Sequence, residues 1–127
     1  MNIEKRGEYK GYKYLVVAHE MGHRCGYIKI PRKNKFYGKN YEEIPIAVHG
    51  GLTFSKRRGG FGRGWWIGFD CAHFGDKPDK SIMSEEYKEV YLKYPHLGLN
   101  KEGQVRNSSY VEKECKSAIK EIIKLNK

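Results

Sequence analysis

The sequence predicts an α+β fold, in which an N-terminal antiparallel sheet of about four to five strands precedes two C-terminal α-helices. Between residues 9 and 75, short β-rich apolar runs alternate with turns that contain glycine or asparagine. From residue 84 onward, apolar residues recur at helical spacing. A chain of 127 residues is the size of one domain, so we expect residues 1–127 to form a single domain.

The first two strands are expected to form a hairpin. Tyr9–Ala18 is rich in β-forming residues, and Arg24–Ile30 resumes with β-branched and aromatic residues after a turn that contains Gly22. Pro31 ends the second strand because it cannot donate to the ladder. The polar segment Arg32–Glu43 then predicts a surface loop.

The stretch His49–Asp76 concentrates glycine, aromatic and basic residues. Two apolar runs, Ile44–Phe54 and Trp65–Phe69, predict two further strands that flank the glycine-rich tip SKRRGGFGRG. Arginine forks suit phosphate and aromatic faces suit stacking, so this composition favours a nucleotide site. The alternative is a solvated basic hairpin whose tryptophans pack in the core.

Two helices are expected after the sheet. Ser84 followed by two glutamates predicts a helix over residues 84–94, which Pro95 ends. Ser109 and Glu112 form an S-x-x-E capping box, which predicts a second helix over residues 109–125. An apolar stripe along this helix fits packing on the sheet, and a subunit interface is the alternative.

Composition limits the classes of function. The chain has 25 Lys and Arg against 15 Asp and Glu, a net charge of +10, which predicts anionic partners. The sequence has no apolar run of membrane-spanning length and no apolar segment at its N-terminus, so we expect a cytoplasmic protein without a membrane partner. Three separated cysteines without C-x-x-C argue against disulfides and a cysteine zinc site.

Three motifs suggest other chemistry. His19-Glu20-Met21-Gly22-His23 matches the H-E-x-x-H pattern of zinc hydrolases, but its β-rich and glycine-containing context favours a turn, so we expect no metal. Cys71 and His73 could meet on one face of a strand, which is a weak indication of a cysteine nucleophile. The run RRGGFGRG resembles arginine-glycine segments that bind single-stranded nucleic acid, and this function is kept as an alternative.

Several motifs together carry a resemblance to a known family. GHRCGYIKI, HGGLTFS, WWIGFDCAHFGD and Arg106 followed by YVEKEC resemble small phage and prophage proteins that include the Thoeris anti-defence protein of the first type. The resemblance spans nearly the whole chain. It implies an antiparallel sheet with two C-terminal helices and assembly into homo-oligomers, either dimers or hexamers.

The resemblance also implies a function. Such proteins are non-enzymatic sponges that sequester the glyco-cyclic ADP-ribose signal of TIR-domain immunity proteins, and some also bind cyclic di- or trinucleotides at a separate site. The expected partner is therefore a small cyclic nucleotide in the bacterial host cytoplasm, with no cofactor and no catalysis. A single-stranded nucleic-acid-binding protein is the first alternative, and an H-E-x-x-H zinc hydrolase is the second.

Residue chemistry assigns provisional roles within such a site. A pyrophosphate requires arginine, adenine requires an aromatic face, and ribose hydroxyls require a carboxylate or an amide. We expect phosphate contacts from Arg57 and Arg106, stacking from Phe74 or Trp65, hydroxyl contacts from Asp76 or Asn107, and a further donor in His73.

Overall fold

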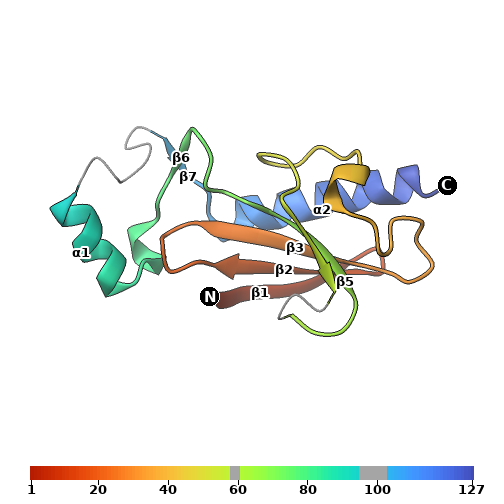
Figure 1. Ribbon diagram of the computed structural model, residues 1–127, viewed down its shortest axis with the longest axis horizontal. Coiled ribbons are helices and arrows are strands. Elements are labelled where there is room, and N and C mark those ends of the chain that lie inside the picture. The colour runs from red at the N-terminus through yellow and green to blue at the C-terminus, as the bar shows by residue number, and fades with distance from the viewer. Residues whose placement is uncertain (58–60, 95–102) are drawn as a thin grey trace.

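The computed structural model describes residues 1–57, 61–94 and 103–127 (Figure 1). Its centre is a five-stranded antiparallel sheet in the order β1-β2-β3-β5-β4. The predicted α+β class, with an N-terminal sheet and a helix at the C-terminus, is confirmed. The strands of this sheet are β1 (Asn2–Tyr9), β2 (Tyr12–Ala18), β3 (Arg24–Ile30), β4 (Phe54–Arg57) and β5 (Trp65–Asp70).

Two helices and several short elements complete the chain. Helix α2 (Ser108–Leu125) lies along one face of the sheet, whereas α1 (Glu85–Lys93) stands at one end of the molecule (Figure 1). A parallel pair, β6 (Asp76–Lys77) and β7 (Gln104–Val105), joins the chain after β5 to the segment before α2. Two 3₁₀ turns occupy Tyr41–Glu43 and Lys80–Ile82.

The main core lies between the sheet and α2. Val16, Ile28 and Ile67 of the sheet are fully buried, as are Ile119 and Ile122 of the helix. Burial of each such side chain contributes roughly 1.5–3 kcal/mol relative to exposure. The alternation of strand side chains therefore places one apolar row under α2 and leaves a second row for the opposite face.

A glycine sets the distance between the sheet and the helix. A Cβ added at Gly26 would lie 2.4 Å from the Phe69 ring and 2.8 Å from the Cys115 sulfur. The missing side chain therefore lets Phe69 and the buried thiol of α2 pack against the bare backbone of β3.

The opposite face of the sheet carries a smaller apolar cluster. Leu15, Tyr27 and Trp66 are buried there, and Phe61 from the loop before β5 packs over them. The Phe61 ring centroid lies 4.2 Å from that of Tyr27 and 5.8 Å from that of Trp66. This aromatic contact holds the described end of the loop against the sheet.

The hairpin and both helices are confirmed, but two strand predictions are corrected. Strand β1 was not predicted because its charged residues interrupt the apolar pattern, which an edge strand tolerates. The predicted strand Ile44–Phe54 is wrong. This segment is largely irregular, since Pro45 lacks an N–H and Gly50 and Gly51 adopt φ values of +69° and +82°. Residues 58–60 of the predicted tip lie outside the described residues.

The start of α2 is also corrected. Asn107, and not Ser109, is the N-cap, and its side chain accepts a hydrogen bond from the Tyr110 N–H at 2.9 Å. Ser109 lies inside the first turn, and Glu112 is hydrogen-bonded to Tyr14 and to Lys5 instead of reaching back to a cap. The predicted capping box fails because two sheet residues use its glutamate.

The H-E-x-x-H segment forms the turn between β2 and β3, as predicted. Gly22 has a φ of +104°, and the His19 and His23 rings stack with centroids 4.7 Å apart. In the described ranges, no group of three or more histidine, cysteine or acidic residues is arranged to hold a metal ion. Nor does any helix within those ranges have the length and apolar character of a membrane span.

Candidate functional site

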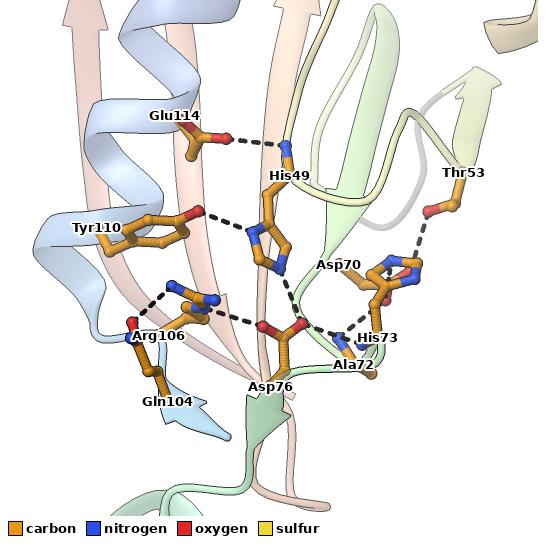
Figure 2. Close-up of polar contacts among 10 residues, drawn as sticks. All are labelled: His49, Thr53, Asp70, Ala72, His73, Asp76, Gln104, Arg106, Tyr110 and Glu114. Carbon is orange, nitrogen blue, oxygen red and sulfur yellow. Dashed lines mark hydrogen bonds and ion pairs between the residues drawn. The ribbon is translucent and has the colours of Figure 1, made fainter. Parts of the chain in front are cut away.

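The polar residues of the central stretch meet the start of α2 at one end of the sheet (Figure 2). Asp76 lies at the centre of this cluster, directly after the turn that follows β5. The loop before β4 contributes His49, and the first turn of α2 and the residues before it contribute Tyr110 and Arg106. Segments that are far apart in the sequence therefore build one site.

Asp76 is a buried carboxylate that accepts hydrogen bonds from three sides. Its Oδ2 accepts from His49 Nε2 at 2.8 Å and from the His73 N–H at 3.0 Å, and its Oδ1 accepts from Arg106 Nε at 2.9 Å. Burial raises the pKa of Asp76, but these hydrogen bonds outweigh it and hold the pKa below its usual value. Asp76 is therefore an anion at neutral pH, and it orients the groups around it.

His49 links Asp76 to helix α2. An ionised carboxylate can only accept, so the network assigns the proton to Nε2, and in the neutral ring Nδ1 accepts from the Tyr110 hydroxyl at 2.7 Å. The His49 backbone N–H donates to the Glu114 carboxylate at 2.8 Å. Burial raises the pKa of Tyr110, with Glu114 adding to the effect, so its hydroxyl is protonated at neutral pH.

Arg106 is held in one orientation, and its contacts with the described residues leave part of its donor capacity unused. Besides Asp76, it donates from Nη1 to Gln104 Oε1 at 3.1 Å, and its guanidinium carbon lies 4.9 Å from the centre of the Tyr110 ring. A guanidinium has five N–H donors, and these two bonds use two of them. The side chain is 22 % exposed and lies beside the N-terminus of α2, where anions are favoured.

His73 and its partners form the second half of the cluster. His73 Nε2 lies 3.0 Å from Asp70 Oδ1, and Asp70 Oδ2 accepts from the Thr53 hydroxyl at 3.0 Å. A Cβ added at Gly50 would lie 2.3 Å from the His73 ring. The glycine after His49 is therefore needed for the two histidine-bearing loops to approach each other.

Phe74 projects from the turn that Asp76 anchors. It is 99 % exposed, and the Asp76 N–H donates back to the His73 carbonyl at 2.9 Å to close this turn. An exposed aromatic ring on a fixed turn costs solvation and contributes nothing to the core. The ring is therefore accessible to a ligand.

The structure brings together four of the seven residues expected in a site and places Phe74 on the same turn. His73, Asp76 and Arg106 belong to the hydrogen-bonded cluster, and Asn107 caps the adjacent helix. The remaining two, Arg57 and Trp65, pair with each other at the opposite end of β5 from Asp70. Trp65 donates from its indole N–H to the Lys39 carbonyl at 3.0 Å.

Cys71 is not placed to act as a nucleophile. Its side chain is buried, and burial raises the pKa of the thiol well above its usual value, with nearby Asp76 adding to the effect. Strand β5 ends at Asp70, so Cys71 and His73 do not lie in a strand as the pattern suggested. The thiol remains protonated and packs in the core.

Sequence reasoning assigned no role to His49 or Tyr110. A signal for His49 was present, since it opens the HGG motif in which Gly50 needs a positive φ and a bare Cα. Tyr110 resembled an ordinary helix residue, and only the position of α2 brings it to the histidine. Comparison of the chain with protein-family models, with curated proteins and with solved structures found no match.

Proposed function

We propose that this chain is a non-enzymatic binding protein that sequesters a small cyclic nucleotide, with glyco-cyclic ADP-ribose as the first candidate, and so blocks a bacterial anti-phage signal. The observation that carries the binding role is Arg106, which Asp76 and Tyr110 hold beside a helix N-terminus, and which keeps N–H donors unused by the part of the chain that the structure describes. The motif resemblance supports the choice of signal, and the cluster supports a ligand that bears phosphate.

The site also contains groups for the rest of a nucleotide. Phe74 offers an exposed face for a base, and His73 lies beside it on the same turn, with its ring 3.0 Å from the Asp70 carboxylate. The raised pKa values of Cys71 and Tyr110 leave both groups protonated, which favours holding a ligand over attacking it. By the same resemblance, we propose a dimer or hexamer, which light scattering would measure.

A capture experiment tests this proposal. The purified protein is mixed with cyclic ADP-ribose isomers and with cyclic di- and trinucleotides, then separated from unbound material and denatured by heat. Mass spectrometry of the released fraction should show one intact cyclic nucleotide in stoichiometric ratio to protein. Catalytic loss of excess ligand would instead establish an enzyme, and capture of none of these compounds would remove the proposal.

Two variants locate the site within this experiment. Phe74→Ala should weaken capture without changing stability, because the ring is 99 % exposed. Arg106→Lys should weaken capture by about 1.5–3 kcal/mol, or roughly ten- to a hundredfold, because lysine loses the fork that contacts phosphate. Leu92→Ala, at an exposed position on α1, is the control and should leave capture unchanged.

A second candidate function follows from the chain Tyr110–His49–Asp76. A carboxylate that orients an imidazole, which in turn accepts from a hydroxyl, is an arrangement found in general acid–base catalysis. Under this alternative His49 would take the proton of the Tyr110 hydroxyl as general base, and the Tyr110 oxygen would in turn accept a proton from the substrate. The two candidates separate in the same experiment, since His49→Gln would abolish turnover in an enzyme, whereas a sponge shows no turnover in any variant.

A further inference from the structure

A pocket lies on the face of the sheet that α2 does not cover. It has a volume of about 460 Å³, which is the size of a small-molecule site. Its floor is apolar, formed by the buried side chains of Leu15 and Trp66 with Phe61 beside them. Strand register explains which residues line the pocket. Leu15 of β2 is paired with Arg6 of β1, and Trp66 of β5 is paired with Lys29 of β3. Leu15 is also paired with Tyr27, two residues before Lys29, so Arg6, Leu15, Lys29 and Trp66 share one face of the sheet.

The rim of this pocket is strongly cationic. Four basic side chains line it against one carboxylate, that of Glu8, and they come from three strands and the loop before β5. These cations are Arg6, Lys13, Lys29 and Arg63. Across the described residues, no carboxylate lies within ion-pair distance of any of them, whereas Arg24 and Arg106 each pair with an acid. Four like charges that converge without neutralisation repel one another and are stabilised by an anion.

The pocket is also held in shape. The Trp66 indole N–H donates to the Gly62 carbonyl at 3.3 Å, which fixes the loop that carries Arg63. A Cβ added at Gly64 would lie 2.5 Å from Lys29 Cε, so the bare backbone there leaves room for the lysine stem to lie along it. Packing therefore positions the Lys29 stem, and the loop that carries Arg63 is held to the sheet, before any ligand arrives.

We infer that this pocket is a binding site for a compact polyphosphate anion, distinct from the Asp76 cluster. The cations surround one cavity instead of following a line, which suits a cluster of charges more than an extended strand. Trp66 is only 4 % exposed, so it gives a base little surface for stacking. Trp66 and its partner Lys29 on β3 lie near the start of β5, whereas the Asp76 cluster adjoins the end of β5. The two sites are therefore separate.

Calorimetric titration with inorganic triphosphate at fixed salt tests the inference. We expect one triphosphate per chain and at least a tenfold weaker affinity in Lys13→Gln/Lys29→Gln. The matched control, Lys113→Gln/Lys124→Gln, removes the same charge from exposed positions on α2 and should change affinity less than twofold. Equal weakening in both double variants would show nonspecific charge attraction and overturn the site.

Further titrations identify the kind of phosphate compound that binds and test whether the pocket is independent of the Asp76 cluster. Tighter binding of a nucleoside triphosphate than of inorganic triphosphate would support the site and assign a nucleotide to it. Tighter binding of single-stranded RNA, with a steep salt dependence that both double variants reduce equally, would replace the pocket by a nucleic-acid surface. Phe74→Ala should leave triphosphate binding intact, and failure of cyclic nucleotide capture leaves this inference standing.

Discussion

At the scale of single residues, the candidate site depends on backbone positions as much as on charged groups. His49, Asp76 and Arg106 hold one another by hydrogen bonds, but the loops that carry His49 and His73 can approach each other only because Gly50 lacks a side chain. Gly50 combines a φ of +69° with a position at which an added Cβ would lie 2.3 Å from the His73 ring. The charged and polar residues of the site can therefore be predicted from the sequence, but the glycine positions that let their loops approach one another cannot.

Replacing Gly50 by alanine should destabilise the protein by more than the matched change at Gly51. Both glycines have positive φ, so each alanine pays roughly 1–2 kcal/mol of backbone strain. Only at Gly50 would the Cβ also meet the His73 ring, which adds about 1–3 kcal/mol. Urea unfolding of both variants gives the difference directly, and equal losses would show that the ring moves aside freely.

At the scale of elements, local sequence signals predicted the β2–β3 hairpin and α1 well. They failed where tertiary contacts decide between alternatives, as at the start of α2. Ser109 and Glu112 satisfy the capping-box pattern, yet Glu112 pairs with Tyr14 and Lys5 of the sheet. Hydrogen bonding to Lys5 is the main reason that the pKa of Glu112 lies below its usual value. A single sequence contains no sign of this competition.

The position of the cap can be measured by two alanine variants. Asn107→Ala should cost about 1 kcal/mol of unfolding free energy, because the Tyr110 N–H loses its partner. Ser109→Ala, inside the first turn and exposed, should stay within about 0.5 kcal/mol of the parent. The reverse order of effects, measured by denaturant unfolding with helicity followed by circular dichroism, would restore the capping box at Ser109.

At the scale of the whole molecule, the sheet separates two regions of different chemistry. One end and face carry the acid-anchored cluster with α2, and the opposite face carries the unpaired cations around Trp66. The net charge of +10 predicted anionic partners, but the sequence could not divide the basic residues between the two regions. That division follows from strand register, which sets the face of each lysine and arginine.

Arg24 links segments that are not neighbours in the sheet. Its side chain is 7 % exposed, and it donates to Glu4 of β1 at 2.6 Å and to Asp79, the cap of the second 3₁₀ turn, at 2.9 Å. It also donates to the Arg106 carbonyl at 3.3 Å. One buried cation therefore links an edge strand, the segment before α1 and the backbone of the candidate site.

Removing this cation should be costly for the whole domain. Arg24→Met leaves two carboxylates without their partner, and we expect a loss of about 2–3 kcal/mol. That figure lies at or below the lower limit of the roughly 3–5 kcal/mol expected for a broken buried pair. The reason is that the Glu4 and Asp79 side chains keep 22 % and 19 % of their surface exposed. Lys5→Met is the control. It breaks the more exposed pair with Glu112 and should cost less than about 1 kcal/mol.

The same variant should also affect the site at a distance. Without Arg24, the Arg106 carbonyl loses its partner, so ligand capture should weaken even under conditions where the chain remains folded. Urea unfolding measures the first effect, and the capture assay at a temperature well below the unfolding transition measures the second. Destabilisation with unchanged capture would show that the side-chain contacts of Arg106 orient it without help from Arg24. Equal stability of Arg24→Met and Lys5→Met would show that the buried cation makes no special contribution to the fold.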